Sequence, residues 1–335
     1  MNKIVLDVMG GDLAPDVNIA GALMAVGELD IQVLLAGDRD RINHLLEGHT
    51  YDESGVKIIH APDVIGMDEH PVRAVRRKKE SSIVIGSEIV GRGEADAFVS
   101  AGNTGAVLAA GIFKIGRISG IERPAIATVL PTPEGPTLLI DAGANVDCKP
   151  QHLADFARMG SIYAREVLEI ANPRVGLLSN GEEEEKGNQL VLNSSPLIEE
   201  CNINYIGHIE GRDIFSGMVD VVVCDGFVGN VVLKLTEGVA KGIFSMLKGA
   251  ITTGLKNQLG ALLVKPALKG VAARMDYTEY GGSPLLGVKK TAIICHGSSD
   301  AKAIYNAIKV ADKIVSSGIN EIINEEAGNS ANASD

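Results

Sequence analysis

The feature that most constrains this chain is a buried-strand pattern that leads through a glycine turn into a helix pattern. It is clearest at residues 219–234, where five of the first six side chains are apolar, as in a strand covered on both faces. Asp225 and Gly226 end that run. Apolar residues then recur at every fourth position, at Val231, Leu235, Val239 and Ile243. This spacing predicts a helix whose first turn offers backbone N–H groups to an anion.

The same pattern recurs five more times along the chain. Strand-like runs lead into polar turns that contain glycine at residues 9–12, 100–105, 141–145, 179–181 and 296–300. Strands that alternate with helices predict an α/β fold with a mostly parallel sheet flanked by helices. Ligands bind such sheets beyond the carboxyl ends of the strands. One glycine turn most often serves only the backbone, but six turns rich in Asn, Ser, Thr and Asp together predict a ligand site.

We expect residues 1–326 to form the α/β catalytic fold, as one domain or as two lobes with the cleft between them. Inside it, residues 236–275 carry six cations and one acid among many apolar side chains, which predicts a protruding amphipathic helical hairpin. The turn-rich stretch 125–140 predicts an antiparallel element. Residues 280–287 are predicted to be a flexible loop, and the polar tail 327–335 to be disordered.

Composition excludes several classes of function. A formal net charge of −12 argues against duplex DNA, and an aromatic content of 4% without tryptophan argues against single-stranded nucleic acid. The four cysteines form no CxxC pair, so no metal site is predicted. The first strand begins at once without a signal-peptide pattern, and no apolar run approaches the ~20 residues of a membrane span. We therefore expect a cytoplasmic protein with reduced thiols.

Motifs narrow the chemistry further. The sequence contains no G-x-S-x-G nucleophile elbow, no G-x-x-x-x-G-K-[ST] P-loop and no G-x-G-x-x-G dinucleotide fingerprint in its first turn. What remains is a site of N–H groups, amides and hydroxyls, which suits a small oxyanion. Arg212 either clamps a phosphate or pairs with a local carboxylate. The densest basic stretch is either a solvated helix face or a dock for phosphate or an acidic partner, and it comprises Arg73, Arg76, Arg77, Lys78 and Lys79.

Seven short motifs, spread over nearly the whole chain, resemble those of the bacterial PlsX-type phosphate acyltransferases. They are DVMGGD at 7–12, SAGNTGA at 100–106, LSNGEE at 178–183, KGN at 186–188, EGRD at 210–213, DGFVGN at 225–230 and YGGSPLLG at 280–287. Val8 departs from the family pattern, where alanine is expected, and the pattern is also loose at His70. The resemblance implies a fold similar to isopropylmalate dehydrogenase and phosphotransacetylase.

The resemblance also implies a reaction and partners. Long-chain acyl-acyl carrier protein and inorganic phosphate would give acyl phosphate for phospholipid synthesis, with no cofactor and no covalent enzyme intermediate. The partners would be acyl carrier protein, a second copy of the chain, the membrane surface and a membrane glycerol-3-phosphate acyltransferase. For the hairpin, helix pairing in a dimer and membrane contact through an apolar tip both remain open. The predicted tip comprises Leu255, Leu259, Leu262, Leu263 and Val264.

For this reaction we expect His296 to protonate the leaving thiolate, Asn230 to stabilise the oxyanion, and Lys186 to bind phosphate. His296 has a purely structural alternative, the capping of the last helix. The remaining predicted phosphate- and substrate-binding residues all lie in the strand-end turns or the short loops beside them. They are Gly10, Gly11, Asn103, Thr104, Gly105, Ser179, Asn180, Arg212, Asp225, Gly226, Gly229 and Ser298.

Two functions from other classes compete with this hypothesis. A metal-dependent hydroxyacid dehydrogenase could use the same fold, and it would need converging Asp residues and a nucleotide pocket. A non-catalytic membrane scaffold would need only the basic hairpin, and it would leave the polar turns unexplained. Phosphate-dependent deacylation of acyl carrier protein separates the acyltransferase from both.

Overall fold

The computed structural model describes residues 1–252 and 280–332, together with positions 260, 263, 264, 266, 267, 270 and 271. Within these residues, eleven strands form one sheet in the order β3-β2-β1-β4-β11-β10-β5-β6-β9-β7-β8. The strands are β1 (Asn2–Asp7), β2 (Ile31–Gly37), β3 (Val56–His60), β4 (Ala97–Ser100), β5 (Ala125–Thr132), β6 (Gly135–Ile140), β7 (Arg174–Leu178), β8 (Asn204–Ile209), β9 (Val221–Val223), β10 (Ser283–Leu286) and β11 (Thr291–Ile294).

The sheet is parallel on both sides of an antiparallel centre. Strands β3, β2, β1, β4 and β11 run parallel to one another, as do β6, β9, β7 and β8. Between the two parallel groups, β10 pairs antiparallel with β11 and β5, and β5 pairs antiparallel with β6. The expected α/β fold and the expected antiparallel element at 125–140 are therefore confirmed.

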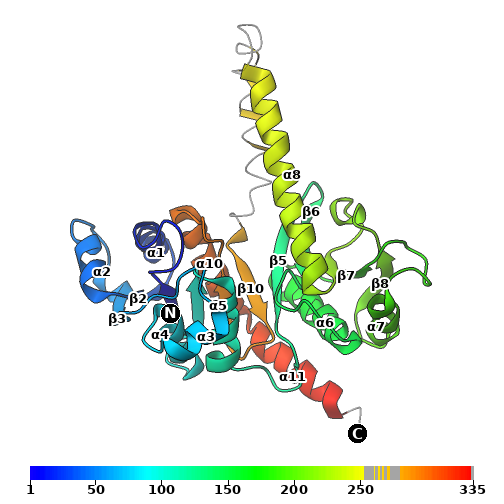
Figure 1. Cartoon of the computed structure of the whole chain (residues 1–335), viewed down its shortest axis with the longest axis horizontal. Coiled ribbons are helices and arrows are strands. Elements are labelled where there is room, and N and C mark those ends of the chain that lie inside the picture. Colours follow the sequence, from blue (N-terminus) through cyan, green and yellow to red (C-terminus); the bar gives the residue numbers. More distant parts are fainter. Residues whose placement is uncertain (253–259, 261–262, 265, 268–269, 272–279, 333–335) are drawn as a thin grey trace.

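Helices cover both faces of the sheet (Figure 1). The α-helices are α1 (Asp16–Glu28), α2 (Arg39–Leu46), α3 (Pro71–Arg77), α4 (Ser82–Gly91), α5 (Thr104–Ala110), α6 (Pro150–Glu166), α7 (Gln189–Glu199), α8 (Gly226–Thr252), α10 (Ala301–Ser317) and α11 (Ile319–Asn332). Short turns of other helix types are η1 (Glu53–Gly55), η2 (Gly111–Ile115, a π-helix) and η3 (Asp213–Phe215).

Strand residues alternate between two aliphatic cores because successive side chains point to opposite faces of a sheet. In β1, Ile4 and Leu6 belong to the core that also contains Ile19 of α1 and Ile304 of α10. Val5 points the other way, into the core that holds residues of α4 and α5. Because both faces are covered, the middle of β1 is a continuous apolar run, from Ile4 to Leu6, as the sequence pattern predicts.

Two local predictions are wrong. Residues 283–286 are not a loop but strand β10, which joins the two parallel groups of the sheet; Pro284 and two glycines beside it had favoured a loop. Helix α11 continues to Asn332, so residues 327–332, which were predicted to be disordered, are helical. Residues 333–335 lie outside the described part of the chain.

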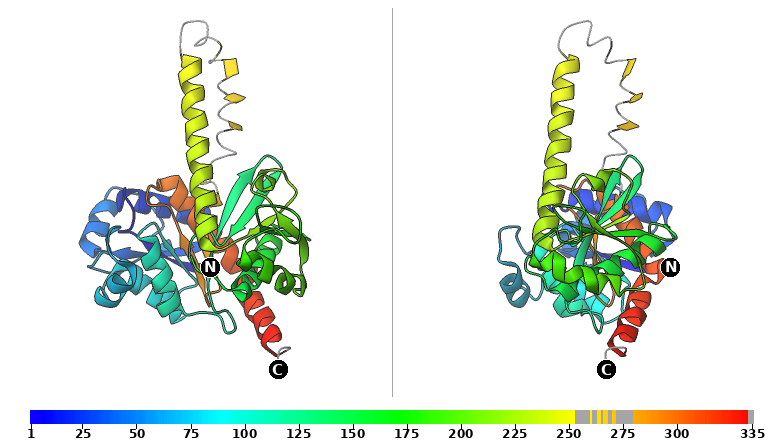
Figure 2. Two further views of the ribbon diagram at one scale, coloured as in Figure 1. Left: turned by 45° about the vertical axis from the view of Figure 1, so that its right-hand side comes forward. Right: turned by 90° about the vertical axis from the view of Figure 1, so that its right-hand side faces the viewer.

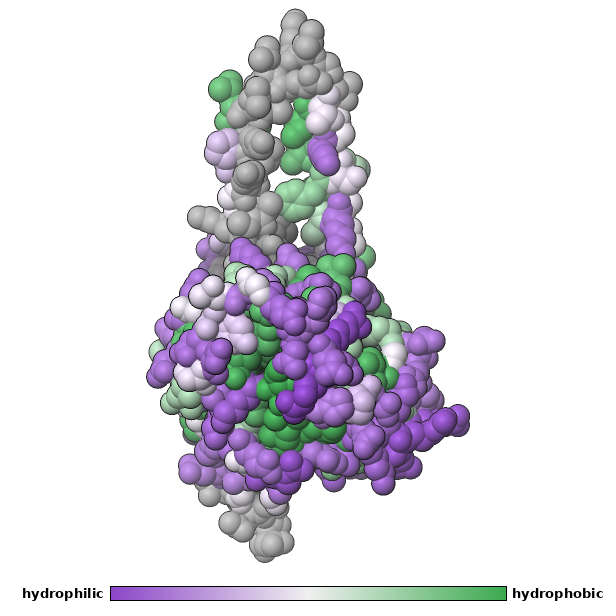
Figure 3. Space-filling model, turned by 90° about the vertical axis from the view of Figure 1, so that its left-hand side faces the viewer, coloured by the Kyte–Doolittle hydropathy of each residue, from purple (hydrophilic) through white to green (hydrophobic). Residues whose placement is uncertain are grey.

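Helix α8 stands out from the body of the protein as one unbroken helix of 27 residues (Figures 1 and 2). At 1.5 Å per residue it is about 40 Å long. Hydrophobic residues are visible on its projecting part in Figure 3. Within the described residues, no helix is both long and apolar enough to cross a bilayer.

The second arm of the predicted hairpin and most of its tip lie largely outside the described residues. Leu255, Leu259 and Leu262 lie outside the described residues. Leu263 and Val264 are described, and they are 84% and 46% exposed. Both are therefore accessible to a partner or to a surface. The hairpin and its tip stay predictions, because most of their residues lie outside the described part of the chain.

Candidate active site

Three strand-end turns meet at one end of a cavity of about 700 Å³. Asp12 follows β1, Thr104 begins the helix after β4, and His296 follows β11; all three line the cavity. These strands are parallel neighbours, so their carboxyl ends reach the same edge of the sheet. The Asp12 N–H donates to the Gly297 carbonyl at 2.7 Å, which ties the first and last of these turns together. The predicted convergence of these turns is thus confirmed.

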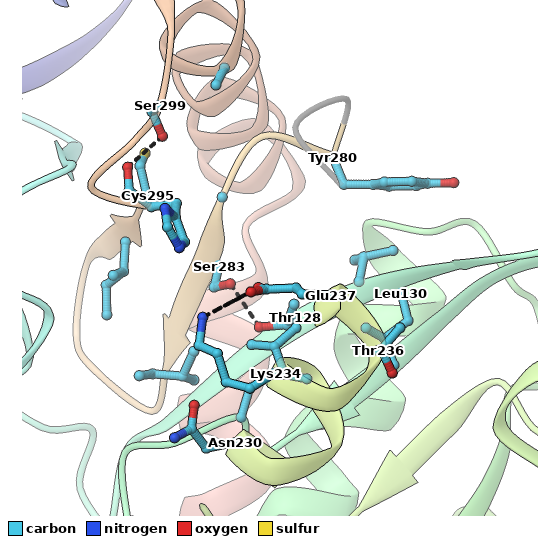
Figure 4. Close-up of a pocket in the computed structure, with 18 of the residues that line it drawn as sticks. Thr128, Leu130, Asn230, Lys234, Thr236, Glu237, Tyr280, Ser283, Cys295 and Ser299 are labelled. Atoms are coloured by element: carbon cyan, nitrogen blue, oxygen red, sulfur yellow. Dashed lines mark hydrogen bonds and ion pairs between the residues drawn. The ribbon is translucent and has the colours of Figure 1, made fainter. Parts of the chain in front are cut away.

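The first turns of α8 form the opposite wall. Asn230, Lys234, Glu237 and Lys241 all line the cavity, and their spacing of four, three and four places them on one face of the helix. Lys234 Nζ lies 3.1 and 3.3 Å from the two carboxylate oxygens of Glu237. Figure 4 shows both side chains reaching from α8 into the cavity, with this ion pair as a dashed line.

The rest of the wall is mainly apolar. Strand β5 contributes a row of residues along the cavity, and α8 adds apolar side chains between its polar ones. The main apolar lining residues are Ile126, Val129, Leu130, Phe215, Leu233, Ala240 and Phe244. The cavity therefore combines a polar end, made by the three turns and Asn230, with an apolar wall that follows α8 away from it.

Two buried aspartates organise the turns around the cavity. Asp7, at the end of β1, accepts from the Ser100 hydroxyl at 2.7 Å and from the Met9 N–H at 3.1 Å. Asp141, after β6, accepts from the N–H groups of Ile126, Gly143, Ala144 and Asn145 and from the Asn145 side chain. Burial raises the pKa of both carboxyl groups, and their hydrogen bonds oppose that rise. The two carboxylates thus use N–H groups that the sequence pattern had offered to a ligand.

Backbone N–H groups at the start of α8 are also hydrogen-bonded within the protein. The Gly226 N–H donates to the Asn145 carbonyl at 2.7 Å, and the Val228 N–H donates to the Asp225 side chain at 2.9 Å. The Gly229 N–H donates to the Asp225 carbonyl within the helix. An anion at this turn would meet the Asp225 carboxylate and N–H groups that are already bonded. The prediction that the opening of α8 binds an anion through free N–H groups is therefore wrong for these three groups.

Several predicted glycine sites have a packing role in the structure. A Cβ on Gly10 would lie 2.3 Å from an Asp7 carboxylate oxygen, and one on Gly105 would lie 2.5 Å from the Pro71 side chain. A Cβ on Gly229 would lie 1.9 Å from the Asp141 carbonyl oxygen. Gly226 is similarly close to the backbone of Asn145, and Gly11 has a φ of +112°. These residues let the turns approach one another, which is a different task from contacting a ligand.

The polar residues predicted after β4 and β7 lie apart from the described cavity lining, except Thr104. The Asn103 amide donates to the carbonyls of Gly66, Met67 and Glu69, so it holds a neighbouring loop. Ser179, Asn180 and Lys186 follow β7, two strands beyond β6, and none is among the described residues that line the cavity.

Arg212 pairs with local carboxylates, which is the second of the two alternatives for this residue. Its guanidinium lies 3.3 Å from a Glu182 carboxylate oxygen and also pairs with Glu210. These two carboxylates and that of Asp213 are the one cluster of potential metal ligands among the described residues, with ligand atoms within 4.8 Å of one another. The Arg212 charge offsets one of the three negative charges of this cluster.

His296 is exposed at the polar end, and its ring orientation follows from its neighbours. Its Nδ1 accepts from the Ser298 N–H at 3.2 Å and lies 2.8 Å from the Ser298 hydroxyl. A neutral ring with an acceptor at Nδ1 carries its proton on Nε2. The helix that follows His296 is α10, and its N-cap is Asp300, whose side chain accepts from the Ala303 N–H. His296 therefore does not supply this cap. Ser298 orients the ring, and Ser299 lines the cavity.

The comparisons with known proteins agree with this architecture. A family described as "Fatty acid synthesis protein" matches residues 2–322. Proteins named phosphate acyltransferase from Pelotomaculum thermopropionicum and Desulfitobacterium hafniense are both 54% identical to the chain, over 96% and 97% of its length and 94% and 97% of theirs. The chain belongs to the PlsX-type phosphate acyltransferase family.

The phosphate acyltransferase family shares its fold with other enzymes. A phosphotransacetylase from Streptococcus pyogenes superposes with a TM-score of 0.65 at 17% identity, over 93% of this chain and 94% of that one. A 4-hydroxythreonine-4-phosphate dehydrogenase from Klebsiella pneumoniae gives a TM-score of 0.54 at 15% identity, over 94% and 100%. At these identities the likeness shows the fold alone. Family membership confirms the predicted acyltransferase and its place in fatty acid or lipid synthesis.

Sequence reasoning missed several residues that line the cavity. Asp12, Glu237 and Ser283 line it, and none was selected as a site residue, whereas the sequence offers Lys234 as a cation beside the turns, with Lys186 and Arg212. A signal existed for Glu237. Polar residues at positions 230, 234, 237 and 241 form a stripe with helical spacing in an otherwise apolar segment, and such a stripe indicates a second, functional face.

Proposed function

We propose that the chain transfers a long-chain fatty acyl group from acyl-acyl carrier protein to inorganic phosphate. The single observation that carries this proposal is the cavity, because an apolar wall along α8 and β5 runs into a polar end. An acyl chain fits the apolar wall, and its thioester carbonyl then lies among the polar groups. A cavity of about 700 Å³ is in the size range of small-molecule sites.

The reaction balances without an enzyme nucleophile. An oxygen of hydrogen phosphate attacks the thioester carbonyl, the C–S bond breaks, and the proton carried by the phosphate passes to the leaving thiolate. The products are acyl phosphate and the free thiol. The Asn230 amide stabilises the oxyanion, and the His296 ring, oriented by Ser298, relays the proton. Cys295 also lines the cavity, but burial raises the pKa of its thiol to about 12, so it is a poor candidate for an acyl-enzyme.

The carrier protein docks, in this proposal, on the basic helix α3. Arg73, Arg76, Arg77 and Lys79 are exposed there, whereas Lys78 pairs with Glu69 at 2.6 Å. Pro71, at the start of α3, contacts the start of α5 where Thr104 lines the cavity. An acidic carrier on α3 would thus stand close to the polar end, and charge complementarity would speed its association.

The outward face of α8 supports pairing with a second copy of the chain. Its exposed side chains are Phe227, Val231, Leu235, Val239, Ile243 and Met246, which are 50–69% exposed. Gly238 and Gly242 lie on the same face one turn apart, and both have open space where a Cβ would stand. A homodimer would cover this stripe, with the predicted apolar tip left to contact the inner face of the cell membrane. There a membrane glycerol-3-phosphate acyltransferase would consume the product.

The decisive experiment mixes the purified protein with acylated carrier protein and measures release of free carrier thiol with and without phosphate. We expect release that requires phosphate, together with acyl phosphate detected as a hydroxamate. Thiol release that is independent of phosphate would identify a thioesterase instead. No release with any acyl chain length would overturn the proposal.

A further inference from the structure

The structure leaves a specific gap in the proposed reaction, because phosphate needs positive charge and the predicted sources of that charge lie elsewhere. Neither Arg212 nor Lys186 is among the described residues that line the cavity. The N–H groups around the turns are largely taken by Asp7, Asp141 and Asp225. An anion in the cavity must therefore find a cationic side chain.

Among the described residues that line the cavity, the lysines and arginines are Lys234 and Lys241, both on α8. Lys234 lies one helical turn after Asn230, at the polar end, whereas Lys241 lies two turns further along the apolar wall. The Lys234 side chain is 52% exposed, so its ammonium remains accessible from the cavity. From this position near Asn230, the Lys234 ammonium can hold the attacking phosphate beside the thioester carbonyl.

Glu237 determines where the Lys234 ammonium points. Its side chain is only 13% exposed and contacts Lys234 through both oxygens, at 3.1 and 3.3 Å. An ammonium has three N–H donors, so an ammonium held by one carboxylate still has a donor for a phosphate oxygen. A flexible lysine stem that is fixed in this way loses less conformational freedom when the ligand binds.

We infer that Lys234 binds the phosphate substrate and that Glu237 is a positioning residue that acts through Lys234. This inference rests on the proposed acyl transfer to phosphate and adds the phosphate site to it. Lys234 is then a substrate-binding residue.

The test is steady-state kinetics on Lys234→Met, with Lys248→Met as the matched control, since Lys248 is exposed on α8 and is not among the described residues that line the cavity. Methionine keeps most of the apolar stem and the helix propensity of lysine while it removes the charge. We expect Lys234→Met to raise the KM for phosphate about 10- to 100-fold, as the loss of a hydrogen bond to a charged group would, while the KM for the acyl donor changes little. Lys234→Arg should recover part of the loss, and the Lys248 variant should keep the wild-type KM for phosphate.

The role of Glu237 is tested by Glu237→Gln in two backgrounds. In the wild type it should raise the KM for phosphate, and in Lys234→Met it should give no further rise, because its effect passes through Lys234. Equal effects in both backgrounds would overturn the positioning role. An unchanged phosphate KM in folded, active Lys234→Met would overturn the phosphate site alone, whereas a wild-type protein without phosphate-dependent transfer would overturn the proposed function itself.

Discussion

Gly229→Ala offers a sharp test of how the first turn of α8 is placed against the sheet. A Cβ at this position would lie 1.9 Å from the Asp141 carbonyl oxygen, and ordinary contact begins at 3.4 Å, so the shortfall is 3.4 − 1.9, or 1.5 Å. The obstacle is backbone that Asp141 itself fixes through its hydrogen bonds. The first turn of α8 must therefore move away from β6.

The expected losses of stability and of activity follow from that displacement. Overpacking costs about 1–3 kcal/mol, and alanine regains about 1 kcal/mol of helix propensity, so the net loss of unfolding free energy should be at most about 2 kcal/mol. The effect on catalysis should be much larger. Asn230 and Lys234 move with the turn, and a misplacement of 1 Å can cost about 100-fold in rate. We expect kcat/KM to fall by about that factor in a protein that still folds.

The assay combines thermal unfolding with phosphate-dependent carrier release on one preparation. Gly27→Ala is the matched control, since Gly27 also lies in a helix and a Cβ there would meet nothing within 4 Å. The control should keep wild-type activity and stability. If Gly229→Ala folds and retains wild-type kcat/KM, the packing of α8 against Asp141 does not position the site, and the reasoning is refuted.

Four other predictions test separate parts of the proposal. Cys295→Ala should keep activity within about tenfold, and no free carrier should appear in a burst without phosphate; a phosphate-independent burst would reveal an acyl-enzyme. Ala240→Phe should narrow the apolar wall and slow transfer from long-chain donors more than from short-chain ones, whereas equal slowing would place the acyl chain elsewhere. Arg76→Glu with Arg77→Glu should raise the KM for the carrier protein at low salt, with a defect that shrinks as salt rises; wild-type affinity would move the dock away from α3. Leu263→Glu should release the protein from anionic vesicles in flotation while transfer in solution and the dimer measured by ultracentrifugation persist, and a mutant that still floats or dissociates would contradict the membrane tip.

Much of the fold was predictable because it is encoded in local periodicity. Strand β9 and helix α8 lie where the pattern at residues 219–243 predicts them, and the antiparallel pair of β5 and β6 lies in the predicted stretch 125–140. The convergence of the turns after β1, β4 and β11 was also predictable, since parallel neighbouring strands bring their carboxyl ends to one edge. Family motifs then indicated the type of reaction, because the motif residues are spread over nearly the whole chain.

The details of the site depended on contacts between residues that are distant in sequence. Strand β10 is four residues long and contains Pro284, so only its pairing with β5 and β11 makes it a strand. The turn N–H groups looked available until the structure showed Asp7 and Asp141 accepting from them. Lys186 and Lys234 are both cations that follow a strand-end turn, and sequence alone cannot rank them. Only the tertiary structure shows their positions: Lys186 follows β7, two strands beyond β6, whereas Lys234 lies on the face of α8 that runs along the cavity.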